Sequence, residues 1–125
     1  MNIYKILKAG LLIFFAAGGY TSCTYETLPT PEIPAEVSFS DDIMPVFDAS
    51  CNGAGCHNQG GIPPDLTQDV AWANLVFGGY VDTLNAEGSI LYVKILPPNG
   101  SMAKFATDKD RALILNWIEQ GAKDN

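Results

Sequence analysis

The segment Cys51-Asn52-Gly53-Ala54-Gly55-Cys56-His57 decides how the rest of this 125-residue chain is interpreted. It holds two cysteines with four residues between them, and the only histidine of the chain follows the second cysteine directly. Two glycines inside the segment indicate a loop. Such a cysteine pair can form a disulfide, part of a metal site, a redox pair or the attachment point of a prosthetic group.

Two of these possibilities lack residues that they need. Zinc takes about four ligands, and no other cysteine or histidine remains in the domain around the pair. A thioredoxin-like redox pair has the spacing Cys-x-x-Cys within a βαβ pattern, which the sequence does not show. A plain disulfide between Cys51 and Cys56 stays open, because it is the usual state of paired cysteines in an exported protein.

Covalent attachment of haem c is the other possibility that the spacing leaves open. It requires two thiols that add to the porphyrin vinyl groups and a histidine, beside the second thiol, that reaches the iron. The usual spacing is Cys-x-x-Cys-His; here two extra residues stand between the cysteines, and Gly53 and Gly55 are expected to let them fold aside.

Iron held by histidine needs a ligand on its other face, and methionine sulfur raises the reduction potential into the range of an electron carrier. Met102 is the one methionine after the cysteine pair, in a loop that contains proline and glycine. It is therefore the candidate ligand. Met44 precedes the cysteines on a predicted helix and is expected to fill the core.

The sequence predicts an all-α domain of four short helices with no convincing sheet. Ser40, Asp41 and Asp42 supply capping oxygens for the first; with Asp42 as the N-cap, Pro45 falls in its first turn, and the helix ends near Ser50. Residues 68–77 form the second, closed by two glycines. Ser89 is expected to cap a third over residues 90–96, where the β-branched residues leave a strand as the alternative.

The final helix has the clearest pattern. Thr107 and Asp110 have the spacing of a capping box, and Gly121 is expected to end the helix. Its apolar face carries Leu113, Ile114, Trp117 and Ile118. About 88 residues with long loops give a small hydrophobic core, so we expect a cofactor or a covalent staple to complete it.

The order of these parts resembles the small single-haem, class I cytochrome c domains of bacterial lipoproteins. The matching pieces are Phe39–Phe47, Cys51–Asn58, Ser89–Ile95, Met102 and Asn116–Ala122. The resemblance covers residues 38–125 and implies a cytochrome c-like fold of about four short helices around a covalently bound haem.

The resemblance also implies roles for individual residues. Cys51 and Cys56 would be the thioether anchors of haem c, with His57 and Met102 as axial ligands of its iron. A carbonyl in the loop after the histidine would accept a hydrogen bond from its Nδ1–H, with Ile62, Pro63 and Pro64 as candidates. Five aromatic residues would either wall the cofactor or simply pack in the core: Trp72, Tyr80, Tyr92, Phe105 and Trp117.

The N-terminus has the pattern of an export signal. Lys5 and Lys8 precede the apolar run 11–17, which is about half of the ~20 residues that a membrane-spanning helix needs. Residues 1–22 are therefore predicted to be a signal peptide. The ending Thr21-Ser22-Cys23 resembles a bacterial lipoprotein signal, which implies acylation of Cys23; ordinary secretion is the alternative.

We expect residues 23–37 to be a proline-rich tether. The tether would hold the domain off a membrane reached through the N-terminal lipid. No Asp follows Cys23 to indicate retention at an inner membrane, so an outer-membrane location, on the periplasmic side or the cell surface, is expected.

Without the signal, five basic side chains face fourteen acidic ones, a net charge of −9. This balance argues against nucleic-acid binding and favours redox protein partners with a basic docking surface. The chain offers no constellation for catalysis. We therefore expect an electron-transfer protein, alone or within a larger redox complex, and not an enzyme by itself. The alternatives are a haem-based sensor or ligand binder and a haem-free module stapled by a disulfide.

Overall fold

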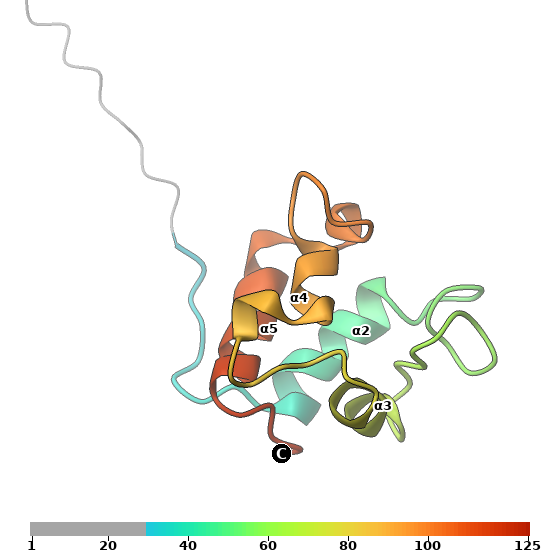
Figure 1. The fold of residues 1–125 in the computed structure, drawn as a ribbon, viewed down its shortest axis with the longest axis horizontal. Helices are drawn as coiled ribbons and strands as arrows, with labels where there is room; N and C mark the ends of the chain where they lie inside the picture. Colours follow the sequence, from blue (N-terminus) through green and yellow to red (C-terminus); the bar gives the residue numbers. More distant parts are fainter. Residues whose placement is uncertain (1–29) are drawn as a thin grey trace, which may run out of the picture.

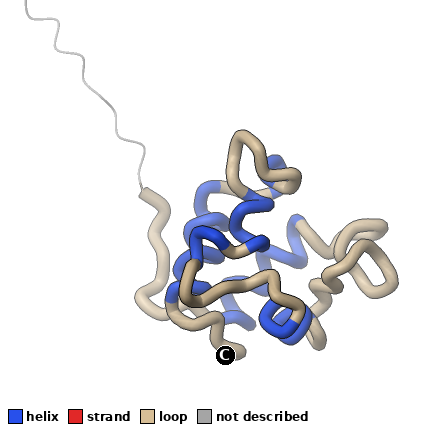
Figure 2. The backbone as a smooth tube through the Cα atoms, viewed as in Figure 1, coloured by secondary structure: helices blue, strands red, loops and turns tan. Residues whose placement is uncertain are grey.

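The computed structural model describes residues 30–125 (Figure 1). The predicted signal peptide, Cys23 and the first part of the tether lie outside the described residues. The elements are η1 (Phe39–Ile43), α2 (Met44–Ser50), α3 (Ala71–Phe77), η2 (Ala86–Gly88), α4 (Ile90–Ile95), η3 (Ala103–Phe105) and α5 (Asp108–Glu119). Figure 2 shows no strand in residues 30–125. The prediction of a small all-α domain with four helices is confirmed for this part, and α4 is a helix, not a strand.

The start of the first helix differs from the prediction. Ser38, not Asp42, is the N-cap: its hydroxyl accepts the N–H of Asp41 at 3.2 Å, and the Asp42 carboxylate accepts the N–H of Ser38 at 2.8 Å. The chain then forms the wide π-helical turn η1, which buries Phe39 and Ile43 together. Helical structure thus begins earlier than expected, because the Ser38 hydroxyl accepts the N–H of Asp41 while the Asp42 carboxylate accepts that of Ser38, an arrangement similar to a capping box.

The core lies between η1, α2 and α5. Its largest fully buried side chains are Trp117, Phe47, Ile43, Leu75, Ile114 and Ile118. The Phe39 ring packs on Trp117 with centroids 5.2 Å apart. The C-terminus returns to the start of the domain, as Figure 1 shows, where Asn125 O accepts the N–H of Ser40 at 2.9 Å. The two ends of the described domain therefore stabilise each other.

Helix α5 forms as predicted. Thr107 and Asp110 make the capping box in both directions, and Gly121 has a φ of 97°, a left-handed conformation that glycine adopts without strain. The four predicted apolar residues of its inner face are all buried. The element that the sequence marked most clearly is therefore confirmed.

Two other boundaries differ. Helix α3 begins at Ala71 and not at residue 68, because the Asp65 carboxylate accepts the N–H and hydroxyl of Thr67 and holds the chain in a turn there. Ser89 is the N-cap residue of α4, as expected, but its side chain makes no capping hydrogen bond. Its buried hydroxyl instead accepts the N–H of Asp82 at 2.9 Å, because the preceding loop takes up the hydroxyl. In residues 30–125, no helix is long and apolar enough to cross a membrane.

Candidate functional site

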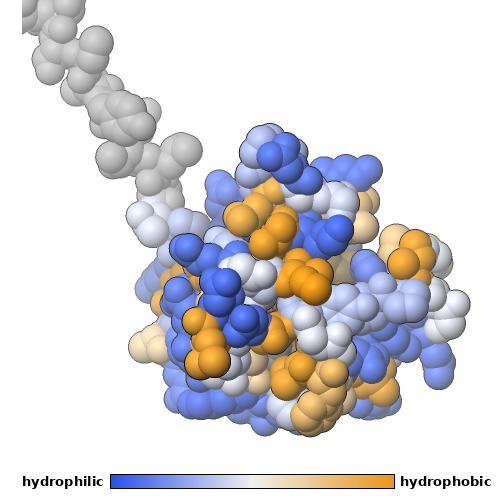
Figure 3. Space-filling view, in the orientation of Figure 1, coloured by the Kyte–Doolittle hydropathy of each residue, from blue (hydrophilic) through white to orange (hydrophobic). Residues whose placement is uncertain are grey.

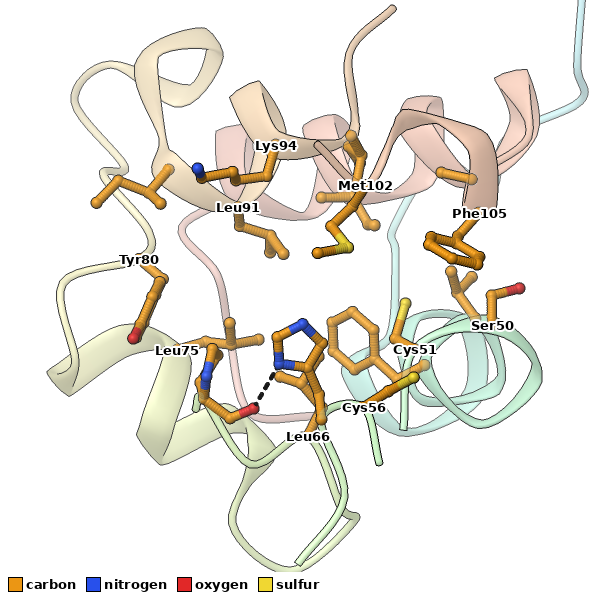
Figure 4. Close-up of a pocket in the computed structure, with 18 of the residues that line it drawn as sticks. Ser50, Cys51, Cys56, Leu66, Leu75, Tyr80, Leu91, Lys94, Met102 and Phe105 are labelled. Carbon is orange, nitrogen blue, oxygen red and sulfur yellow. Dashed lines mark hydrogen bonds between the residues drawn. The ribbon is translucent and has the colours of Figure 1, made fainter. Parts of the chain in front are cut away.

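A cavity of about 330 Å³ opens between α2, the loop after it, α4 and the segment around η3 (Figure 4). This volume is within the range of about 300–1,000 Å³ that is typical of ligand pockets. Its walls are mainly apolar, with Val46, Phe47, Leu66, Leu75, Leu91, Ile95 and Ile114 among them. The cavity also brings together four residues that the sequence singled out: Cys51, Cys56, His57 and Met102.

The two cysteines stand on the α2 side of the cavity, as Figure 4 shows. Cys51 ends α2, and its N–H donates to Phe47 O at 2.8 Å. The loop then closes on itself, because the N–H of His57 donates to Cys51 O at 3.1 Å. Neither thiol is in a disulfide; Cys51 is half-buried and Cys56 exposed. The long spacing between the cysteines therefore still brings both thiols and the histidine to one wall.

Burial raises the pKa of the Cys51 thiol to about 11, with smaller contributions from the charge of Asp110 and from Cys56. Burial therefore favours the neutral thiol at Cys51 at neutral pH. The described part of the chain contains no group of three or more His, Cys, Asp or Glu residues that could hold a metal ion.

His57 has a defined orientation at the cavity wall. Its Nδ1 lies 2.9 Å from Ile62 O and 3.1 Å from Pro64 O. Carbonyl oxygens only accept hydrogen bonds, so Nδ1 carries the hydrogen. In the neutral imidazole the lone pair is then on Nε2, which has no hydrogen-bond partner among the described residues. The prediction that a carbonyl in residues 62–64 accepts this N–H is confirmed, with Ile62 and Pro64 as the acceptors.

Met102 reaches the cavity from a different wall. Its side chain comes from the segment before η3 and directs its sulfur into the space that the cysteines border on the α2 side (Figure 4). Its N–H donates to Lys94 O at 2.8 Å, and that of Gly100 donates to Leu96 O at 2.7 Å, so the loop folds back on α4. Met44 is buried in the core, as expected, and does not line the cavity.

Only two of the five aromatic candidates line the cavity, Tyr80 and Phe105. Trp117 is fully buried elsewhere and donates from Nε1 to Lys123 O at 2.9 Å. Trp72 donates to Ala122 O at 2.8 Å. Both indoles thus hold the C-terminal residues, and Tyr92 lies outside the lining as well. Helical periodicity places such residues on an inward face, but it does not distinguish the core from a cavity wall.

The sequence interpretation missed two basic residues of the site. Lys94 is the one charged residue that lines the cavity. Arg111 is bound to backbone carbonyls around η3. The local pattern carries no signal for Arg111, because Lys109 lies nearer the start of the same helix and is a cation without a side-chain partner among the described residues.

Comparisons with known proteins add no assignment. No family model, curated protein or solved structure matches this chain. The fold and the site therefore define a small all-α domain in which two thiols, one oriented imidazole and one thioether border a mainly apolar cavity.

Proposed function

We propose that this protein is a c-type cytochrome that binds one covalent haem and transfers single electrons outside the cytoplasm. The orientation of His57 carries the proposal. Its Nδ1–H donates to two carbonyls, which leaves the lone pair of Nε2 available to a metal. Both thiols and the Met102 sulfur line the same cavity as His57. Ligating histidines usually donate their other N–H to such a group, which makes the imidazole a stronger donor.

The residues present fit haem c. Each thiol would add its sulfur and its hydrogen across one vinyl group, so a neutral thiol, as burial favours at Cys51, holds all the atoms required. When bound, haem supplies an iron that gains and loses one electron. His57 and Met102 would hold that iron from two walls, and the apolar side chains around them would exclude water.

The Met102 thioether favours a carrier over a sensor. If His57 and Met102 both held the iron, no position would be open for a small ligand, and electron transfer would need no catalytic group. Export, attachment of a lipid to Cys23 and an outer-membrane location are parts of the proposal that rest on the sequence pattern of residues 1–23.

The proposal is tested by expressing the full chain in a host with cytochrome c maturation machinery. We expect one haem per chain that resists extraction under denaturing conditions, and a low-spin oxidised spectrum with the methionine-to-iron charge-transfer band. Met102→Leu should keep the covalent haem and lose the band. Met44→Leu, the same change at a buried methionine outside the cavity, should keep both.

Other outcomes would support the alternatives. A chain without covalent haem, and with Cys51 and Cys56 joined in a disulfide, would contradict the cytochrome and favour a stapled interaction module. A high-spin spectrum that changes when carbon monoxide is added would contradict the carrier and favour a ligand-binding or sensor haem. The variant in which both cysteines become alanine gives the baseline without attachment.

A further inference from the structure

We infer that Arg111 is a positioning residue that holds Met102 at the cavity, an inference that rests on the proposed role of Met102 as an iron ligand. The Arg111 side chain is only 15% exposed. Its Nη1 donates to Ala106 O at 2.6 Å and reaches Ile95 O and Ala103 O at 3.4 Å each. Its Nη2 is paired with the Asp108 carboxylate.

These acceptors enclose the methionine loop. Ile95 is the last residue of α4, Ala103 follows Met102 directly, and Ala106 joins η3 to α5. One side chain therefore connects the helix before the loop, the residue beside the methionine and the helix after the loop. The backbone hydrogen bonds of Gly100 and Met102 tie the loop to α4, whereas Arg111 ties its far end to α5.

The chemistry of the site requires arginine. A guanidinium is a planar group with five N–H donors, so it reaches several carbonyls and a carboxylate at once. Lysine offers a point charge on a flexible stem and cannot reproduce this geometry. A cation near the start of α5 is also opposed by the helix dipole. The three carbonyls and the Asp108 carboxylate offset this repulsion. The groups that hold Arg111 therefore belong to the segment that Arg111 stabilises.

The consequence for the proposed site concerns the sulfur. Met102 is half-buried and enters the cavity from a loop segment with no regular helix of its own. If the far end of this segment is released, the sulfur loses its defined place opposite the thiols. Arg111 would thus act through Met102, while Cys51, Cys56 and His57 stay in place on the α2 side.

The test compares full chains, produced with the maturation machinery, that carry Arg111→Lys, Arg111→Gln or the control Lys109→Gln. Lys109 is an exposed cation on the same helix without a hydrogen bond or ion pair to a described side chain. We expect covalent haem in every variant. The methionine-to-iron band should weaken, or be lost at lower pH in an alkaline titration, in both Arg111 variants and not in the control.

Hydrogen exchange gives a second measurement that does not depend on haem. The amides of Gly100 and Met102 should exchange about tenfold faster or more in the Arg111 variants, the effect expected when hydrogen bonds from a charged donor are lost. Amides in the middle of α5 should change much less. An unchanged band and unchanged exchange in both variants would overturn the inference. A wild-type chain without covalent haem would contradict the proposed function, and the exchange rates would then decide the role of Arg111 alone.

Discussion

At the scale of single residues, the two glycines between the cysteines differ in backbone conformation. Gly55 has a φ of 77°, in the left-handed region, whereas Gly53 does not, and a Cβ at either position would meet no atom within 4 Å. A side chain would therefore fit at either glycine, and the two positions differ only in their backbone conformation. The lengthened loop depends on a left-handed residue at Gly55, so flexibility at both glycines, as the sequence suggested, is not required.

This difference predicts the outcome of a matched pair of substitutions. Gly55→Ala should lower the stability of the haem-loaded protein by about 1–2 kcal/mol, the cost of a left-handed conformation for a residue with a Cβ. Gly53→Ala should be close to neutral. Denaturant unfolding of both variants measures the two effects, and equal losses would show that the conformation of Gly55 is not what closes the loop.

At the scale of elements, the loop between α2 and α3 is organised by a turn at Asp65. Its carboxylate accepts the Thr67 hydroxyl at 2.7 Å and the Thr67 N–H at 2.9 Å. These bonds, the hydroxyl first, lower the pKa of Asp65 below its ordinary 3.8. The next residue, Leu66, donates its N–H to His57 O at 2.7 Å. The turn therefore lies next to the backbone that holds the proposed iron ligand.

The lowered pKa predicts a pH dependence of stability. Because the folded state favours the charged carboxylate, its contribution is complete above the ordinary pKa of 3.8 and is lost as the pH falls through the lower folded pKa. Asp65→Asn should therefore be less stable than wild type at neutral pH, and the difference should shrink below pH 3.8. Melting temperatures from pH 7 downward test this.

Asp69→Asn is the control for this prediction, because Asp69 is an exposed acid of the same loop with no hydrogen bond to its side chain within the described residues. A constant difference between wild type and Asp65→Asn at all pH values would contradict the assigned role of the charge.

At the scale of the whole molecule, acidic side chains predominate, but the border of the cavity is mainly apolar. Residues 30–125 carry thirteen acidic and five basic side chains, a net charge of −8. No acidic residue lines the cavity, whereas the half-exposed Ile62, Ile90 and Phe105 do. Figure 3 shows hydrophobic side chains on the surface over α4, among hydrophilic neighbours. The charge would steer a partner from a distance, and the apolar border of the cavity would form the contact.

This arrangement predicts how salt affects electron transfer, provided that the protein is loaded with haem. Oxidation by a cationic complex such as tris(1,10-phenanthroline)cobalt(III) should slow as ionic strength rises, and oxidation by anionic hexacyanoferrate(III) should accelerate, because salt screens attraction and repulsion respectively. Stopped-flow rates at several salt concentrations measure both. The opposite pattern would mean that Lys94 at the cavity outweighs the net charge, and that a docking partner is acidic, not basic.

Local sequence patterns predicted much of the fold, although some assignments failed. The capping box of Thr107 and Asp110 was predictable because it involves two residues of one turn. Asp42 is not the N-cap, and Ser89 is the N-cap residue of α4 without a capping bond from its side chain. Each side chain has a partner that the pattern does not contain: Ser38 N–H for the first and the Asp82 backbone for the second. A polar side chain near a helix start identifies a candidate cap, but its neighbours determine which group it binds.

The cysteine pair, the histidine beside it and the lone methionine after it are properties of the sequence, and so are the helical periodicities that make the domain all-α. The helical periodicities can be predicted because each helix depends mainly on contacts between residues a few positions apart. The tertiary structure decided the rest. The Met102 sulfur shares a cavity with Cys51 and Cys56, whereas Trp72 and Trp117 lie outside it. Arg111 braces the loop between α4 and α5. Those relations join α2, α4 and α5 across long separations in the chain, and they exist only once burial of the core has set the helices against one another.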